Sequence, residues 1–219
     1  MSIADMAAWS GLDDFLDRAR ARLDPVRGLA KLPEGGDHDF VPAERLDSIR
    51  PAGVLAPIIQ RVAEPTMLLT LRPETMAQHA GQVAFPGGKV DPVDRDEVDA
   101  ALRETEEEVG VASDQVELIA RGAPYVTASA FRIVPVLGLL PGDVAPTAHP
   151  EEVADIFEAP LSFLMNPANH EVRTGFWRGR ERRYYAMPYE GHLIWGVTAG
   201  LIRTLYVELY GEEADGHDH

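Results

Sequence analysis

The sequence predicts an α/β fold in which helices cover both faces of a mixed β-sheet. Short apolar runs rich in branched residues, which are typical of strands, alternate with segments whose apolar residues recur at helical spacing. The chain has 219 residues, of which 45% are hydrophobic and 26% charged, so it fits one domain of ordinary size with a sizeable core. Strands and helices mixed in this order favour an α/β/α sandwich around the sheet.

Residues 10–157 contain most of the predicted elements. An amphipathic helix is predicted for residues 10–23, and a connector containing Pro and Gly follows over residues 25–42. The apolar, branched runs that predict strands lie at residues 54–62, 67–72, 82–85, 116–120, 133–140 and 153–157. An acidic helix is predicted for residues 96–109, between the third and fourth of these runs.

The second half ends in a predicted hairpin and a predicted helix. The hairpin is expected to pair residues 170–176 with residues 182–187 and to turn at Gly179. Thr198 is expected to cap the final helix. Five apolar residues share one face of that helix: Leu201, Ile202, Leu205, Tyr206 and Leu209.

Composition and charge exclude several classes of function. The formal net charge of −16 opposes association with nucleic acid, which depends on Lys and Arg contacts to phosphate. The absence of cysteine excludes disulfides, thiolate metal sites and cysteine nucleophiles. No apolar stretch approaches the roughly 20 residues of a membrane span, and the first residues lack a basic region followed by an apolar run. We therefore expect a soluble, cytoplasmic protein without membrane or nucleic-acid partners.

The acidic helix is the most informative element. One stripe of this helix is expected to pack against the core through Val98, Leu102, Thr105 and Val109. Glu104, Glu107 and Glu108 lie together on another side, and Gly110 is placed to end the helix. Because Glu104 and Glu108 repel each other, the helix gains most if a hard cation with oxygen ligands, such as Mg²⁺, lies between them. The alternative, a solvated acidic face, is common on helices.

The same segment resembles the Nudix box, a motif of Gly, five residues, Glu, seven residues, Arg-Glu, an aliphatic, any residue, Glu-Glu, any residue, Gly and an aliphatic. The matching residues are Arg103, Glu104, Glu107, Glu108, Gly110 and Val111. There are two departures: Thr105 occupies an aliphatic position, and the stretch from Gly88 to Arg103 is one residue longer than the pattern. The upstream Glu position therefore falls on Asp94 or on Arg95, depending on the end from which it is counted.

A second motif narrows the resemblance to a subgroup. Residues 68–88 are similar to the signature of coenzyme A diphosphatases within the Nudix superfamily, which also carry the longer Gly-Gly-Lys-x-Asp loop. The two motifs together cover residues 68–111 without a gap. The resemblance implies a Nudix-type α/β/α sandwich around a mixed sheet. With the helical spacing at the start and the polar composition at the end, we expect an N-terminal helix and connector at residues 1–44, a Nudix hydrolase domain at residues 45–210 and a disordered polar tail at residues 211–219.

The resemblance also implies an activity. It implies metal-dependent hydrolysis of the pyrophosphate bond of coenzyme A or its thioesters, giving 3′,5′-ADP and 4′-phosphopantetheine or its acyl derivative. One alternative is a Nudix hydrolase of another nucleoside diphosphate derivative, such as ADP-ribose, NADH or a nucleoside triphosphate. A second is a ligand-sensing Nudix domain without turnover, although such a domain has no need for the Nudix-box carboxylates. A homodimer is compatible with the sequence.

The helix and the glycine loop are expected to hold the metal. Glu104, Glu108 and Glu107 are the expected ligands of Mg²⁺ or Mn²⁺, and the resemblance adds the Gly88 carbonyl. Arg103 precedes Glu107 by four residues and is placed to orient that carboxylate, so both are expected to serve catalysis. Gly87 and Gly88 are expected to let the backbone approach phosphate closely.

Other candidates come from outside the helix. Glu152 precedes a predicted strand where the subgroup similarly places a carboxylate, so it is a candidate general base or metal ligand, the alternative being a surface acid. The subgroup signature includes His79 and Gln82, either as substrate contacts or, for the histidine, as a loop-fixing group. Four further residues are predicted to meet substrate phosphates or to be solvated charges: Arg72, Lys89, Arg178 and Arg180.

Overall fold

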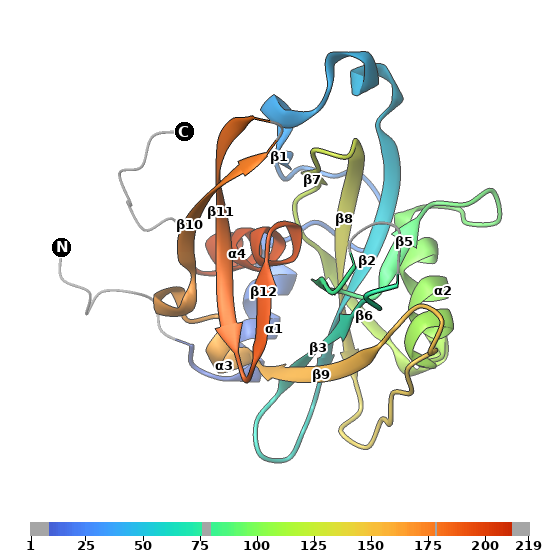
Figure 1. Cartoon of the computed structure of the whole chain (residues 1–219). Coiled ribbons are helices and arrows are strands. Elements are labelled where there is room, and N and C mark those ends of the chain that lie inside the picture. Colours follow the sequence, from blue (N-terminus) through green and yellow to red (C-terminus); the bar gives the residue numbers. More distant parts are fainter. Residues whose placement is uncertain (1–8, 76–79, 178, 212–219) are drawn as a thin grey trace.

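The computed structural model describes residues 9–75, 80–177 and 179–211, which form two β-sheets and the helices packed on them (Figure 1). The helices are α1 (Leu12–Arg22), α2 (Glu97–Val109), α3 (Leu161–Leu164) and α4 (Val197–Tyr210), with 3₁₀ turns η2 (His38–Phe40), η3 (Ala43–Ser48), η4 (Ser113–Gln115) and η5 (Pro167–Asn169). The strands are β1 (Gly35–Gly36), β2 (Arg50–Ile59), β3 (Thr66–Leu71), β4 (Val83–Ala84), β5 (Gly87–Lys89), β6 (Glu117–Arg121), β7 (Tyr125–Val126), β8 (Phe131–Leu140), β9 (Asp155–Pro160), β10 (Glu171–Trp177), β11 (Arg180–Tyr189) and β12 (His192–Trp195).

The large sheet is mixed, as predicted. Its strand order is β1-β7-β8-β2-β3-β4, while β5 pairs with β2, β6 with β8 and β9 with β3. The central strands β2 and β8 run parallel from Arg50↔Phe131 to Ile59↔Leu140. The strands β10, β11 and β12 form a separate antiparallel sheet.

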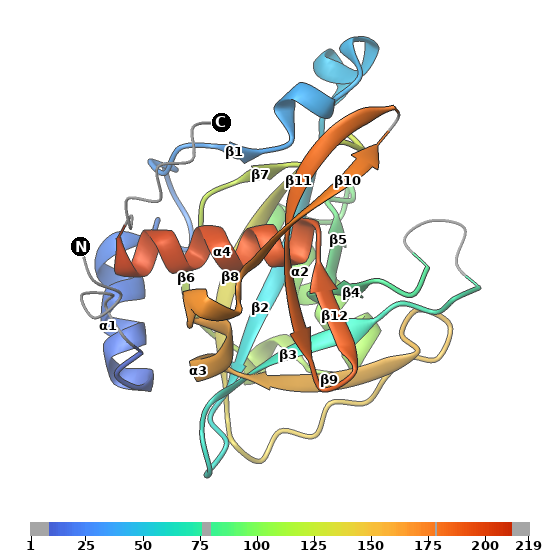
Figure 2. The same ribbon diagram turned by 60° about the vertical axis from the view of Figure 1, so that its left-hand side comes forward.

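Different helices cover the two faces of the large sheet, which confirms the predicted α/β/α arrangement. On one face Leu55 of β2 packs with Val98 and Ala101 of α2. On the other face Ile58 of the same strand belongs to a core that also contains Phe15 of α1 and residues of α4 and the small sheet. The alternation follows from the period of two along a strand. Figure 2 shows α1 and α4 together on the side of the sheet away from α2.

The position of α2 is fixed by its ends and by a glycine. The Asp96 carboxylate caps the helix by accepting the N–H groups of Val98 and Asp99, both at 3.0 Å. Gly110 ends it in the left-handed conformation at φ 67°, as predicted. Gly53 lets the helix lie against β2, since a Cβ there would come within 1.8 Å of the Glu97 carbonyl oxygen.

Some predictions differ from the structure. Thr198 is not the N-cap of α4: Gly196 holds that position, and the Thr198 hydroxyl donates to the Val83 carbonyl at 2.9 Å. The strand expected at residues 153–157 is β9, Asp155–Pro160, so a turn separates it from Glu152. The predicted hairpin is confirmed as β10 and β11. No helix among the described residues is both long and apolar enough to span a membrane.

Candidate metal and pyrophosphate site

Three carboxylates converge at one end of α2. Glu104 and Glu108 lie one turn apart on the helix, and Glu152 comes from the turn that precedes β9. One oxygen of each lies within 4.8 Å of an oxygen of the other two. Within the described part of the chain the structure thus brings together two of the predicted metal ligands and the residue whose role as base or ligand was open.

The turn that carries Glu152 is held against α2 and β3 by backbone hydrogen bonds. The His149 N–H donates to the carbonyl of Glu108, and the Thr147 N–H donates to the carbonyl of Val109, both at 2.9 Å. The Ala154 N–H donates to the carbonyl of Leu71 at 2.8 Å. The last carbonyls of α2 are available to this turn because the helix ends at Gly110. The third carboxylate is therefore positioned by the elements that carry the rest of the site.

The electrostatic surroundings of Glu108 favour a bound cation. Glu108 is 4% exposed and accepts the Gly87 N–H at 3.2 Å, while Arg72 Nη1 lies 4.0 Å from its other oxygen. Burial, with smaller contributions from the charges of Glu104 and Glu152, raises the pKa of Glu108 to about 7, against the opposing effects of the Gly87 N–H and Arg72. A divalent cation with oxygen ligands would supply the positive charge that this group of carboxylates needs, so the donor set fits Mg²⁺ or Mn²⁺.

Arg103 orders the neighbouring acidic groups. It binds Asp94 through two hydrogen bonds of 3.0 Å, from Nε and Nη2, and its Nη1 donates to Glu104 at 3.0 Å and to Glu107 at 3.1 Å. The Arg103 guanidinium lowers the pKa of Asp94. Of the two residues that compete for the upstream carboxylate position, Asp94 is thus the one joined to the site, whereas Arg95 pairs with Asp99.

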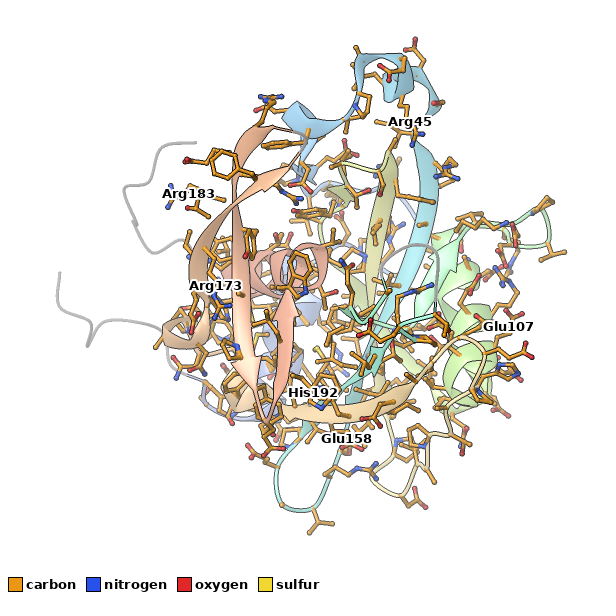
Figure 3. The ribbon with its side chains drawn as sticks, viewed as in Figure 1. Arg45, Glu107, Glu158, Arg173, Arg183 and His192 are labelled. Carbon is orange, nitrogen blue, oxygen red and sulfur yellow. The ribbon has the colours of Figure 1, made fainter. Side chains whose placement is uncertain are left out.

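The expected contact of Arg103 with Glu107 is present, but Glu107 lies outside the group of three. Its side chain is 52% exposed on the surface of α2, where Figure 3 labels it. Its predicted roles as metal ligand and catalytic residue remain predictions.

The glycine loop contacts the carboxylates through its backbone. Gly87–Lys89 form β5, in which Gly88 pairs with Gly53 of β2. A Cβ at Gly88 would lie 2.5 Å from the Glu104 carboxylate, so a side chain there would displace that group. The Gly87 N–H is directed at Glu108 instead of facing outward for a phosphate. The Gly88 carbonyl remains a predicted ligand.

The other residues predicted to contact substrate differ in their surroundings. The Arg72 Nε atom is buried without a hydrogen-bond partner. The Gln82 carbonyl accepts the Arg72 N–H at 3.0 Å, which places Gln82 beside it. Lys89 is exposed and pairs with Asp91 at 2.9 Å. Two other predicted contacts, His79 and Arg178, lie outside the described residues.

The arginines that the hairpin carries at positions 173, 180, 182 and 183 are not gathered at the carboxylates. Arg180 donates to the Asp39 carbonyl at 2.7 Å, and Arg182 forms an ion pair with Asp37. In Figure 3, Arg173 and Arg183 lie on the small sheet, on the opposite side of the molecule from Glu107. These arginines therefore do not supply positive charge at the predicted metal site.

Comparisons with known proteins agree with the geometry. The NUDIX domain family model matches residues 49–176, more than half of the chain. The chain is 40% identical to the "Uncharacterized Nudix hydrolase NudL" of Photorhabdus laumondii over 195 residues, which is 89% of this chain and 95% of that protein. It is 42% identical to the protein of the same name from Yersinia pestis over 156 residues, 71% of this chain and 78% of that protein.

A solved structure of the C. elegans Ap4A hydrolase in a binary complex also matches, with a TM-score of 0.45 and 21% identity over 50% of this chain and 80% of that one. Nudix hydrolases act on nucleoside diphosphate derivatives and generally use divalent metal ions. With the family model covering most of the large sheet and α2, and a relative 40% identical over nearly its whole length, the chain belongs to the Nudix hydrolase family.

Proposed function

We propose that this Nudix hydrolase cleaves the pyrophosphate bond of coenzyme A or its thioesters, giving 3′,5′-ADP and 4′-phosphopantetheine or its acyl derivative. The observation that carries the hydrolytic part is the convergence of Glu104, Glu108 and Glu152 beside Arg72. The choice of coenzyme A is supported by the similarity of residues 68–88 to the coenzyme A diphosphatase signature.

The charges at this site suit a pyrophosphate diester. Such a bond is stable in water because its negative oxygens repel hydroxide, so hydrolysis requires charge neutralisation and an aligned nucleophile. Arg72 is placed to meet one phosphate, since its guanidinium faces the carboxylates and its Nε atom is buried without a partner. Glu152 is more exposed than Glu108 and is the carboxylate best placed to take a proton from water.

The proposed cofactor is Mg²⁺ or Mn²⁺, held by Glu104 and Glu108 with a contribution from the Gly88 carbonyl or Glu107, while Glu152 acts either as the general base or as a further ligand. When bound, a divalent cation neutralises phosphate charge and makes water a better nucleophile at neutral pH. The residues of this chain hold and orient these carboxylates: Arg103 fixes Glu104, and the Gly87 N–H fixes Glu108.

A substrate panel tests the proposal. Purified protein is incubated with Mg²⁺ or Mn²⁺ and coenzyme A, acetyl coenzyme A, ADP-ribose, NADH and a dinucleoside polyphosphate, and the products are identified by mass. We expect 3′,5′-ADP and 4′-phosphopantetheine from coenzyme A at a kcat/KM at least tenfold above that of the other compounds. Preferred cleavage of ADP-ribose or NADH would show that the substrate is another nucleoside diphosphate derivative and not coenzyme A. No cleavage of any compound would contradict the hydrolytic proposal itself.

A further inference from the structure

The small sheet carries an aromatic pair that the proposed chemistry does not use. Tyr184 of β11 and Trp195 of β12 meet edge to face, with ring centroids 5.6 Å apart and planes at 63°. They lie on the same face of the sheet, because Trp195 pairs with Ala186 and Tyr184 lies two residues before Ala186 on β11. Trp195 is 37% exposed although it is large and apolar. A partly open aromatic surface of this kind is suited to a planar ring.

The residues beneath the pair are small. Ala186 is fully buried, and Tyr184 lies over β10 at Gly175, where an added Cβ would come 3.3 Å from the ring. With no larger side chain at either position, the Tyr184 ring lies directly against the strands, and the exposed part of the pair is supplied by Trp195.

Positive charge continues along the same face. Arg182 is the next residue on this face of β11 after Tyr184, and Arg180 follows it. Their guanidinium groups lie over the Phe40 ring at 5.6 Å and 4.9 Å from its centroid. Arg182 is ion-paired with Asp37, whereas Arg180 donates to a neutral acceptor, the Asp39 carbonyl. The face thus joins aromatic rings to the positive charge of Arg180, a combination suited to a nucleotide base that carries phosphate.

The strand that carries Trp195 lies near the strands that lead to the candidate catalytic site. Trp195 is three residues before Thr198, whose hydroxyl donates to the Val83 carbonyl of β4 at 2.9 Å. Val83 pairs with Leu71 of β3, directly before Arg72. β12 therefore lies beside the strand pair that leads into the carboxylate group. The other exposed aromatic residue in the described part of the small sheet, Phe176, pairs with Glu181 and points from the opposite face.

We propose that Tyr184 and Trp195 bind the purine base of the substrate by stacking, while the carboxylate group handles its pyrophosphate. This inference rests on the proposed function for the choice of a nucleoside diphosphate derivative, and it adds the place where the base is recognised. The three carboxylates cannot serve this purpose, because a neutral aromatic ring gains little from anionic oxygens and a cation. The specificity for a base-bearing substrate then comes from the small sheet and not from the Nudix box.

Binding without catalysis tests the inference first. Tryptophan fluorescence is recorded in metal-free buffer while AMP is added, with ribose 5-phosphate as the probe that lacks the base. We expect saturable quenching by AMP that is lost in Trp195→Ala, and none by ribose 5-phosphate. Equal quenching by both probes, or quenching by AMP that persists in Trp195→Ala, would overturn the proposal.

Kinetics test it a second time. In Trp195→Ala the KM for the best substrate of the panel should rise about tenfold or more, the usual effect of losing one stacked aromatic side chain, with kcat within about twofold of wild type. Trp195→Phe should recover most of the KM, and Phe176→Ala is the matched control that should leave it unchanged. An unchanged KM in a folded Trp195→Ala protein contradicts the base site but leaves the proposed function standing. AMP-dependent quenching in a protein that cleaves no compound would support the base site and contradict the proposed function.

Discussion

Glu108 shows how much the candidate site departs from what stability alone would favour. The carboxylate is almost completely buried, yet its hydrogen-bond donor is a backbone N–H, and its nearest guanidinium lies at 4.0 Å. Burial of a charge with so little compensation is costly, and the proximity of Glu104 and Glu152 adds repulsion. Such an arrangement is typical of a functional site that is completed by a ligand.

Loss of either helix carboxylate should therefore remove turnover while keeping the fold. We expect Glu104→Gln and Glu108→Gln each to lower kcat by roughly 10²-fold or more, on the order of 3 kcal/mol. Glu106→Gln is the control, because Glu106 is exposed and does not belong to the group of three. Near-normal kcat in both site variants, measured with saturating Mg²⁺, would exclude them as ligands.

Glu152→Gln separates the two roles that Glu152 can have. If Glu152 is the general base, kcat should fall by roughly 10²- to 10⁴-fold with little change in KM, and excess Mn²⁺ should not restore it. If it is a metal ligand, a high concentration of Mn²⁺ should recover much of the loss. The comparison is Glu151→Gln, since this neighbour lies outside the carboxylate group; an effect confined to Glu151→Gln would show that the wrong residue was chosen.

A partly buried carboxylate, Glu208 of α4, should make stability depend on pH. One of its oxygens accepts the Ala123 N–H at 3.0 Å and the other is buried without a partner. Burial, with a smaller contribution from Asp24, raises the pKa of Glu208 to about 7. Because the folded pKa lies above the unfolded one, the stabilisation is complete below the unfolded pKa and is lost as pH rises through about 7.

The corresponding measurement is urea unfolding between pH 5 and 8 for wild type and Glu208→Gln. We expect the wild-type free energy of unfolding to fall by at most about 3 kcal/mol more than that of the variant over this range. The variant keeps a side-chain oxygen for the Ala123 N–H, so it should fold normally. If the free energy of unfolding depended on pH in the same way for the two proteins, the raised pKa of Glu208 would be contradicted.

At the scale of elements, the contact between α2 and β2 sets the position of the helix carboxylates. Gly53→Ala would place a Cβ within 1.8 Å of the Glu97 carbonyl oxygen, so α2 must shift away from the sheet. We expect the free energy of unfolding to fall by about 1–3 kcal/mol or more, measured by thermal unfolding, and kcat to fall as well, measured by steady-state kinetics. Gly35→Ala, where an added Cβ meets no atom within 4 Å, is the matched control and should leave kcat unchanged.

The predictability of these elements follows from their length and their local signals. The acidic helix was predicted for residues 96–109 and is found at Glu97–Val109, because Asp96 and Gly110 mark its ends and its apolar stripe spans several turns. The strands β5, β7 and β12 were not predicted, since two to four residues give no detectable alternation and they form by pairing with distant strands.

The site was predictable where one helix carries it and not where distant segments meet. Glu104 and Glu108 follow from a single motif, whereas the approach of Glu152 depends on hydrogen bonds of its turn to the end of α2. Asp94 could not be distinguished from Arg95 by counting, because the loop has an additional residue; the choice is made in space by the Arg103 guanidinium. The Thr198 cap was wrong because the helix already begins at Val197, after Gly196 turns the chain with a positive φ of 63°.

At the scale of the whole molecule, the N-terminal helix belongs to the same core as the rest of the chain. Phe15 is fully buried, in the cluster that contains Tyr206 of α4 and Met67 of β3. We expect Phe15→Ala to lower the free energy of unfolding by about 3–5 kcal/mol, measured by urea denaturation. Leu46→Ala is the control, since Leu46 is 51% exposed. A small effect of Phe15→Ala would indicate that residues 1–44 fold independently of the remainder.

The parallel pairing of β2 with β8 has a consequence for the order of folding. Residues 50–59 pair with residues 131–140, and α2 lies in the segment between them. Contacts so far apart in sequence form slowly, because a long loop must close before they contribute. During synthesis, Glu104 and Glu108 emerge well before β8, and Glu152 emerges after it. A nascent chain would therefore carry the helix carboxylates before β8 can pair with β2 and before Glu152 is present, so metal affinity should appear late, only after the central strands have paired.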